Sequence, residues 1–262
     1  MHNTVRTPAV AGMFYPDNAA ELSNMVDQFL QDVKVAGPVP KAIIAPHAGY
    51  IYSGPIAASV YARLTPVHDQ IQRVVLLGPS HQVPLKGLAA STMLQFATPL
   101  GKIPVDKPAI DNILSLPQVS VLEQAHVNEH SLEVQLPFLQ KVLGNFSLIP
   151  LVVGEATPKQ VAEVLEKLWG GPETLIVISS DLSHYHDYQT AQKMDKLTSQ
   201  AIENLRPEDI HYKQACGRNP INGLLLIAQK RGMIAQTVDL RNSGDTAGTR
   251  DQVVGYGAYV FN

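Results

Sequence analysis

Apolar runs of strand length, separated by segments with helical periodicity, constrain the fold of this chain more than any other feature. The runs are Lys41–Ala45, Arg73–Leu77, Leu148–Val153, Thr174–Ser179 and Val253–Phe261. Their near-continuous leucine and β-branched content is typical of strands that are covered on both faces. The last run alternates with glycine and tyrosine, which indicates an edge strand or an antiparallel partner.

Between these runs, apolar residues recur every three or four positions, as on one face of a helix. The first such stripe is Leu22, Val26, Phe29, Leu30 and Val33. Further helices are predicted over Ile56–Leu64, Ser131–Leu143, Pro158–Leu168, Ala191–Leu205 and Pro220–Lys230. Thr157 is a suitable N-cap for the helix that starts at Pro158. Strands that alternate with helices predict an α/β fold, which we expect to be a single domain over residues 1–262 with a mixed, mostly parallel sheet flanked by helices.

Composition excludes several classes of protein. The formal net charge is only -3, so the chain lacks the basic surface that binds nucleic acid or anionic membranes. A single cysteine excludes a disulfide framework, a zinc finger and a cysteine-held iron–sulfur cluster. Met1–Pro8 lacks an apolar signal region, and no apolar stretch approaches the ~20 residues of a membrane span. We therefore expect a cytoplasmic protein with no nucleic-acid or membrane partner, and a homo-oligomer is compatible with the sequence.

Three histidines directly follow predicted strands. His47 comes after the run at Lys41–Ala45, His81 after Arg73–Leu77, and His184 after Thr174–Ser179. In open α/β sheets, ligands bind outside the carboxyl ends of the strands, so these imidazoles are expected to share one crevice. The other histidines lack this context, and we expect a surface position for His2, His68, His126 and His211 and no special role for His186.

Two acidic residues open a predicted helix. Glu129 and Glu133 are four positions apart and would share one helical face. The segment lacks the paired histidines of a zinc-binding helix. We expect a solvated first turn, in which carboxylates are favoured by the helix dipole, with a position on a pocket wall as the alternative.

Cys216 is the only thiol and lies in a turn before a predicted helix. A lone cysteine is usually a small buried hydrophobe. A thiol near a helix N-terminus can instead have a lowered pKa and act as a metal ligand or a nucleophile. The residue pattern leaves both roles open.

Several stretches of the chain resemble one known family. They are Pro8–Tyr15, Ile44–Gly54, Leu77–His81, Glu129–Glu133, Ser179–His184 and Cys216–Pro220. In this order, and spread over nearly the whole chain, they are similar to the MEMO family, also called AmmeMemoRadiSam system protein B. Animal members of the family are described as signalling and redox-linked proteins, and some microbial members as catechol dioxygenases.

The resemblance implies a fold similar to class III extradiol dioxygenases, the non-haem iron enzymes that open catechol rings. It implies a metal site made of His47, His81 and Cys216. It also implies that His184 is the acid/base, with Asp181 beside it in the pocket and orienting it. In the dioxygenases a carboxylate takes the place of the thiolate, and a thiolate is a softer ligand.

From the resemblance we expect Fe(II) as the cofactor, with Cu or Zn as alternatives, and a small catecholic substrate with dioxygen as the partners. Tyr50 and Tyr52 are expected to line the substrate slot, together with Glu129 and His130, and Arg218 to meet a substrate carboxylate. The rival interpretation is a non-enzymatic metal- or peptide-binding module on the same fold. A zinc hydrolase is a weaker third interpretation, because one cysteine with two histidines is an unusual catalytic zinc set.

Overall fold

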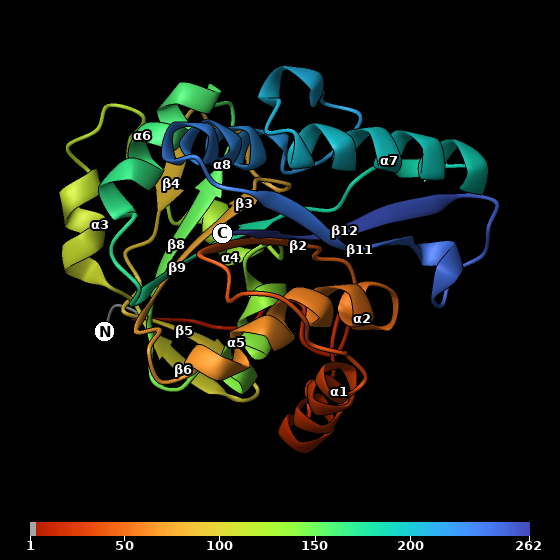
Figure 1. The fold of residues 1–262 in the computed structure, drawn as a ribbon. Coiled ribbons are helices and arrows are strands. Elements are labelled where there is room, and N and C mark those ends of the chain that lie inside the picture. The colour runs from red at the N-terminus through yellow and green to blue at the C-terminus, as the bar shows by residue number, and fades with distance from the viewer. Residues whose placement is uncertain (1–3) are drawn as a thin grey trace.

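A nine-stranded sheet crosses the middle of the molecule in the computed structural model, which describes residues 4–262 (Figure 1). A second sheet of three strands lies below it. The strands are β1 (Val5–Arg6), β2 (Ala42–Ala45), β3 (Arg73–Pro79), β4 (Leu88–Ala90), β5 (Gln95–Thr98), β6 (Gly101–Pro104), β7 (Val119–Val121), β8 (Ser147–Val153), β9 (Thr174–Ser179), β10 (His184–His186), β11 (Ala235–Asn242) and β12 (Val253–Phe261).

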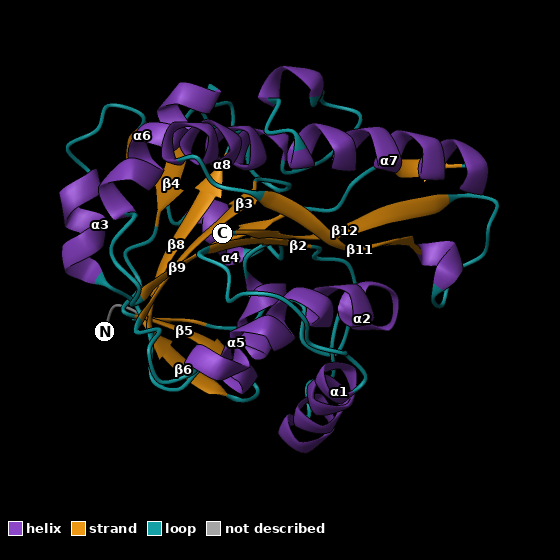
Figure 2. Cartoon of the chain, in the orientation of Figure 1, coloured by secondary structure: helices purple, strands orange, loops and turns teal. Residues whose placement is uncertain are grey.

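The helices cover both faces of the large sheet (Figure 2). They are α1 (Ala19–Gln31), α2 (Tyr50–Tyr61), α3 (Lys107–Ile113), α4 (Gln124–Val127), α5 (Leu136–Val142), α6 (Pro158–Leu168), α7 (Tyr188–Glu203) and α8 (Arg218–Arg231). Short 3-10 helices are η1 (Ala62–Val67), η2 (Glu133–Gln135), η3 (Pro207–Asp209) and η4 (Ser243–Asp245). In Figure 1, α6, α7 and α8 lie above the sheet, whereas α1, α2 and α5 lie below it with the small sheet.

The centre of the large sheet is parallel. The strand order is β10-β12-β2-β9-β3-β8-β4-β7, and β11 pairs with the remaining edge of β12. Strands β2, β9, β3 and β8 run parallel to one another, whereas β12 pairs antiparallel with β2 and β4 pairs antiparallel with β8. The central strands are buried along nearly their whole length, as their continuous apolar sequences require. The predicted fold class, α/β with a mixed, mostly parallel sheet flanked by helices, is confirmed.

The predicted elements agree with the structure where the sequence pattern is strongest. Helix α6 spans the predicted Pro158–Leu168, and Thr157 caps it in a capping box with Gln160. The last strand pairs antiparallel, as its pattern indicated, and is enclosed between β2 and β11. The helix predicted over Ser131–Leu143 is wrong in its first half, because Glu133–Gln135 is a 3-10 turn and the α-helix begins only at Leu136.

Within residues 4–262, no helix combines the length and the apolar character needed to cross a membrane.

Candidate metal centre

The carboxyl ends of the parallel strands bring the three ligand candidates together. His47 lies two residues beyond β2, and His81 lies two residues beyond β3. Strand β9 runs between them, with Ser179 in register with Ala45 of β2, and leads directly to Asp181. Cys216 comes from the loop before α8 and meets the chain at this point, because its backbone N–H donates to the carbonyl of Asp181.

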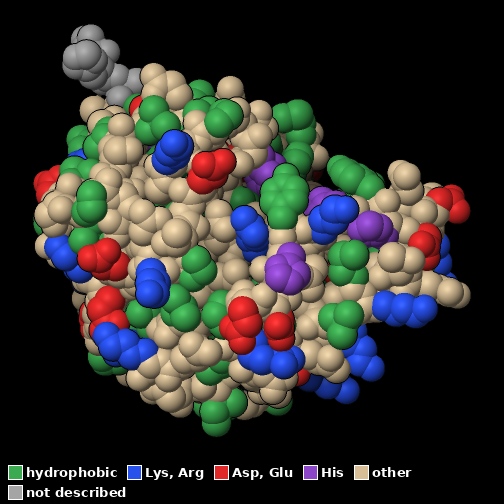
Figure 3. All heavy atoms as spheres, turned by 90° about the horizontal axis from the view of Figure 1, so that it is seen from above, with side chains coloured by type: hydrophobic (Ala, Val, Ile, Leu, Met, Phe, Trp, Pro, Cys, Tyr) green, Lys and Arg blue, Asp and Glu red, His purple; other side chains and the backbone are tan. Residues whose placement is uncertain are grey.

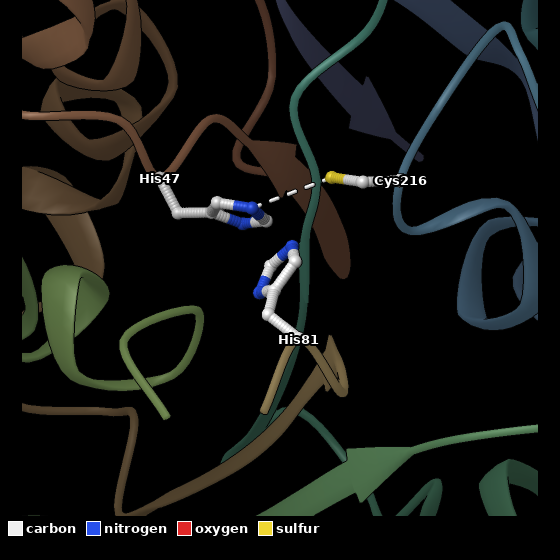
Figure 4. A group of neighbouring side chains, drawn as sticks. All are labelled: His47, His81 and Cys216. Carbon is white, nitrogen blue, oxygen red and sulfur yellow. Dashed lines mark hydrogen bonds between the residues drawn. The ribbon is translucent and has the colours of Figure 1, made fainter. Parts of the chain in front are cut away.

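The three side chains point toward one another (Figure 4). One ligand atom from each of His47, His81 and Cys216 lies within 4.8 Å of the other two. Cys216 Sγ is 3.4 Å from His47 Nε2, and the two imidazole rings meet edge to face with their centroids 5.2 Å apart. Two imidazoles and one thiol at these separations form a set that can close around one metal ion.

Hydrogen bonds fix the tautomer of His47. Its Nδ1 lies 2.8 Å from the hydroxyl of Ser179, and that hydroxyl donates its only proton to the carbonyl of Ser131. Ser179 Oγ must therefore accept from His47 Nδ1–H, which leaves a lone pair on Nε2, the atom that faces Cys216. Burial, together with the neighbouring His81 and His130, holds the pKa of His47 well below its usual value, so the ring is neutral.

A buried carboxylate fixes His81 in the same way. Glu129 accepts from the Nδ1–H of His81 at 2.8 Å and from its backbone N–H at 2.6 Å, and it also accepts from Ser131 N. Burial alone would raise the pKa of Glu129, but these hydrogen bonds outweigh it and lower the pKa to about 2. An ionised carboxylate behind Nδ1 leaves the Nε2 of His81 free to bind a metal.

Cys216 is seated by a close approach of two backbones. A Cβ on the following residue, Gly217, would lie 2.6 Å from the Cβ of Ser180, so only glycine allows this turn. The sulfur accepts from the backbone N–H of Asp181 at 3.3 Å. Burial and the nearby Asp181 raise the pKa of the thiol to about 12, which contradicts the lowering expected from a helix N-terminus. A metal ion would reverse this, because a coordinating thiol loses its proton.

The donor atoms of His47, His81 and Cys216 are therefore suited to binding a metal ion. The two imidazoles each carry a nitrogen that can bind a metal, and the thiol beside them needs a cation in order to ionise. A second group of possible ligands, His81, Glu129 and His130, lies within the same reach. The oxygens of Glu129 are already used by hydrogen bonds to His81 and Ser131, so we interpret this carboxylate as the support of a ligand.

A cavity of about 800 Å³ opens on the histidine side of this centre, and we call it the histidine cavity. Segments far apart in the chain build its wall. The lining residues are Met13, Phe14, His47, Ala48, Gly49, Tyr52, His81, His130, Asp181, His184, Tyr185, Ser243, Ala247, Gly248, Thr249, Gln252, Val254 and Tyr256. Figure 3, which views the molecule from above, shows histidine side chains reaching the surface in one region with lysine or arginine side chains beside them.

Comparison with known proteins identifies the family. A family model described as Memo-like protein matches residues 6–260. The chain belongs to the MEMO family. It is 38% identical to a MEMO1 family protein of Aquifex aeolicus, over 98% of this chain and 99% of that protein. It is 34% identical to MEMO1 family proteins of Sulfolobus acidocaldarius and Thermotoga maritima, each over 96% of this chain and 97% of the relative.

The fold also occurs among solved structures. An uncharacterized protein of Escherichia coli K12 superimposes with a TM-score of 0.50, covering 83% of this MEMO-family chain and 98% of the other. The two sequences are 12% identical, so this likeness concerns the fold alone.

His184, the predicted acid/base, and Asp181, predicted to orient it, both line the histidine cavity. His184 is partly buried, and burial lowers its pKa. The next residue, Tyr185, has a positive φ of 60° at an irregularity in the pairing of β10, which is strained for a bulky residue. Asp181 does not orient His184 as expected. Its carboxylate instead accepts from the backbone N–H of His47 at 2.7 Å, and burial raises its pKa to about 7.

Three predicted substrate contacts need correction. Tyr50 is buried in the core, where it packs on Phe138 and donates to a backbone carbonyl, so it is a packing residue, whereas Tyr52 does line the histidine cavity. Glu129 is neither solvated nor on the cavity wall, because it lies buried behind His81. Arg218 lines a different cavity, on the far side of Cys216. His130 lines the histidine cavity and stacks on His81 with ring centroids 4.6 Å apart.

The predictions for the remaining histidines are confirmed for some and wrong for one. His68 and His211 reach the surface as predicted, and His2 lies outside the described residues. His126 was expected at the surface and is wrong, because it is buried and its Nε2 contacts the carbonyl of Ala89. Its pKa is lowered to about 4, chiefly by burial. Of its neighbours only Ala125 is also buried, whereas Gln124 and Val127 are exposed, so the local sequence pattern does not indicate burial.

Two structural roles near the centre were not predicted from the sequence. Ser179 and Gln135 hold His47, since Gln135 donates to the Ser179 hydroxyl at 2.7 Å. Glu133, expected in a solvated turn, is fully buried against Arg6 and Tyr15. The only sequence signal for Ser179 is its position just before the Ser180–His184 motif. Hydrogen bonds between segments that are far apart in the chain produce no recognisable residue spacing, so the other contacts could not be predicted.

Proposed function

We propose that this MEMO-family protein is a mononuclear non-haem Fe(II) dioxygenase that cleaves a catecholic ring next to its diol. The observation that carries the proposal is the convergence of two imidazoles and a thiol, with both imidazoles at the wall of a cavity of about 800 Å³. His184 and Asp181 line the same cavity, so a proton acceptor is available beside the centre.

A ferrous ion held by His47, His81 and Cys216 would supply open positions for dioxygen and a diol and would lower the pKa of a bound hydroxyl. The chain's own residues do the rest. Burial keeps His184 neutral near pH 7, so its ring can accept the proton of a diol and return it later. Glu129 and Ser179 hold the two ligand rings in the tautomer that binds metal.

The walls of the histidine cavity suit an aromatic substrate. Phe14, Tyr52 and Tyr256 contribute aromatic surface, and Phe14 packs against His130 with ring centroids 4.9 Å apart. The volume lies within the range of small-molecule sites, ~300–1,000 Å³. Apolar walls also exclude water from the reacting centre, which strengthens the electrostatic interactions there.

The thiolate distinguishes this centre from the usual two-histidine, one-carboxylate set. It keeps a single negative charge but is softer, so copper and zinc are the alternative metals. A soft, partly buried ligand set also favours the second candidate function, a metal-binding module that holds its ion without turnover. The only cysteine of the chain is prone to oxidation when no metal is bound, and a reducing compartment would protect it. We therefore propose that the protein acts in the cytoplasm.

The test combines metal content with turnover. Protein reconstituted anaerobically with Fe(II) is exposed to air and a series of catechols, and the yellow ring-cleavage product is followed by absorbance. Cys216→Ala should lose metal and activity, and Cys216→Asp should restore part of both, because a carboxylate recreates the usual facial set. His184→Ala should keep the metal but turn over about 10²–10⁴-fold more slowly.

The control is His68→Ala, which removes a half-exposed imidazole paired with Asp69, outside the cluster. It should change neither metal content nor rate. Metal retained in Cys216→Ala, or lost in His184→Ala, would contradict the assigned roles. Iron bound by the unaltered protein with no cleavage of any catechol would replace the enzyme with the metal-binding module.

A further inference from the structure

A second cavity, of about 580 Å³, lies on the sulfur side of the metal centre. It is lined by Pro79, Ser80, Val83, Pro84, Leu85, Lys86, Val153, Gly154, Glu155, Tyr212, Cys216, Arg218 and Asn219. The histidine cavity and this sulfur-side cavity share none of their described lining residues. Of the three ligand candidates, His47 and His81 therefore line the histidine cavity, and Cys216 lines the sulfur-side cavity.

The sulfur-side cavity carries two cations. Arg218 and Lys86 both line it, against one carboxylate, Glu155. Within residues 4–262, neither cation lies within ion-pair distance of a carboxylate. The guanidinium of Arg218 instead lies over the ring of Tyr212, 5.8 Å from its centroid. An arginine held on an aromatic ring without an anionic partner keeps its planar fork free for a carboxylate.

One side of the wall is apolar, and hydrogen bonds hold it in place. Val83, Pro84 and Leu85 contribute apolar surface from the loop after β3. Backbone hydrogen bonds fasten this loop to the end of β8, from Ser80 N to the carbonyl of Val153 at 3.0 Å and from Glu155 N to the carbonyl of Leu85 at 2.9 Å. The cavity is therefore formed before a ligand arrives, which reduces the entropic cost of binding.

Asn219 fastens the opposite wall. Its side-chain amide donates to the carbonyl of Gly154 at 2.7 Å, which ties the start of α8 to the end of β8. Arg218 and Cys216 lie on this same short stretch of chain, so the cation and the sulfur are held at fixed positions across one cavity.

We propose that the sulfur-side cavity binds a small carboxylate with an apolar body, seated on Arg218 and Lys86 beside Cys216. The apolar wall matches the body, and the two unpaired cations match the charge. This site is separate from the histidine cavity and does not depend on the proposed dioxygenase activity. A ligand here would lie beside Cys216, in a cavity separate from the one lined by His47 and His81.

The probe is benzoate, titrated by calorimetry into the protein as purified and again after dialysis against a chelator. Benzoate should bind, and benzamide, its neutral counterpart, should not. Arg218→Gln should weaken benzoate about 10-fold or more, because a charge-assisted bidentate contact is lost. Lys86→Gln, at an exposed position where misfolding is not a concern, should weaken it by a smaller factor. The matched control is Arg250→Gln, since Arg250 also lies over a tyrosine ring, Tyr188, but lines neither cavity.

A second readout uses the single cysteine of the chain. Benzoate should slow the alkylation of Cys216 by iodoacetamide in the chelator-treated protein, and it should lose this effect in Arg218→Gln. The proposal is overturned if benzoate binds more weakly than about 10 mM. It is equally overturned if benzamide or inorganic phosphate binds as well as benzoate, or if binding is unchanged in both Arg218→Gln and Lys86→Gln.

Discussion

Replacing the buried carboxylate of Glu133 by an amide should destabilise the protein strongly. The side chain is fully buried and is paired with Arg6, itself almost entirely buried. Its Oε2 accepts from Arg6 and from Ala9 N at 2.7 Å, and its Oε1 accepts from Val10 N at 3.0 Å and from Tyr15 Oη at 2.6 Å. Every acceptor position of the carboxylate is therefore used by a donor.

In Glu133→Gln, the amide nitrogen would best take the place of Oε1. The Tyr15 hydroxyl can rotate to accept from it, whereas Val10 N–H would face another donor and lose its bond. Arg6 would keep a carbonyl oxygen but lose its counter-charge in a buried site. Removing one partner of a buried ion pair costs about 3–5 kcal/mol, so we expect the free energy of unfolding to fall by that amount. The apparent melting temperature should drop by roughly 10 °C for a chain of this size.

The assay is equilibrium unfolding in urea, followed by circular dichroism. The matched control is Glu166→Gln, which makes the same chemical change in an exposed pair with Lys230 and Arg231. Exposed pairs contribute at most about 1 kcal/mol, so this variant should stay within that range. A loss in Glu133→Gln no larger than that in Glu166→Gln would show that the buried network contributes no more than an exposed pair.

Two further predictions concern other carboxylates. Glu129→Gln should weaken metal binding by about 10–100-fold, because the group that accepts from His81 Nδ1 loses its charge. Competition with a chelator measures the metal affinity. The control is Glu123→Gln, which alters a carboxylate hydrogen-bonded to Ser91 and Thr92 and should leave the metal affinity unchanged. Burial raises the pKa of Asp195 to about 6, although the hydrogen bond from Ser183 N opposes this shift. Between pH 4 and 6 the folded state therefore holds more protons than the unfolded state, and the free energy of unfolding falls as pH rises through that window. Asp195→Asn lacks this titration, so from pH 4 to pH 7 its unfolding free energy should rise by up to about 3 kcal/mol relative to that of the unaltered protein. An equal difference in unfolding free energy between the two proteins at both pH values would refute the assignment.

The sequence was sufficient to predict the elements and residues whose patterns are local. Continuous apolar runs are confirmed as the central parallel strands, and the rule that ligands gather at the carboxyl ends of such strands brought His47 and His81 to one place. Cys216 could not be assigned from its spacing, since its role depends on a turn that Gly217 allows against Ser180. Only the family resemblance named it as a ligand.

The segment 129–135 shows why the rest could not be predicted. Its spacing of acidic residues is that of an exposed helical turn, but both carboxylates are buried, each against a different partner. Glu129 goes to His81 and Glu133 to Arg6, and a regular helix would place them on one face. The chain therefore leaves the helical path until α5 begins at Leu136.

This irregular segment also connects the two imidazoles of the candidate metal centre. The carbonyl of Ser131 accepts from the Ser179 hydroxyl, which fixes the tautomer of His47, while the carboxylate of Glu129, two residues earlier, fixes that of His81. Glu133 holds the N-terminal segment that carries Phe14 to the cavity wall. A regular helix here could satisfy its own backbone, but it could not place these groups behind two different rings. The cost of an irregular, buried and charged segment is thus offset by a candidate metal centre in which both imidazole rings are already oriented.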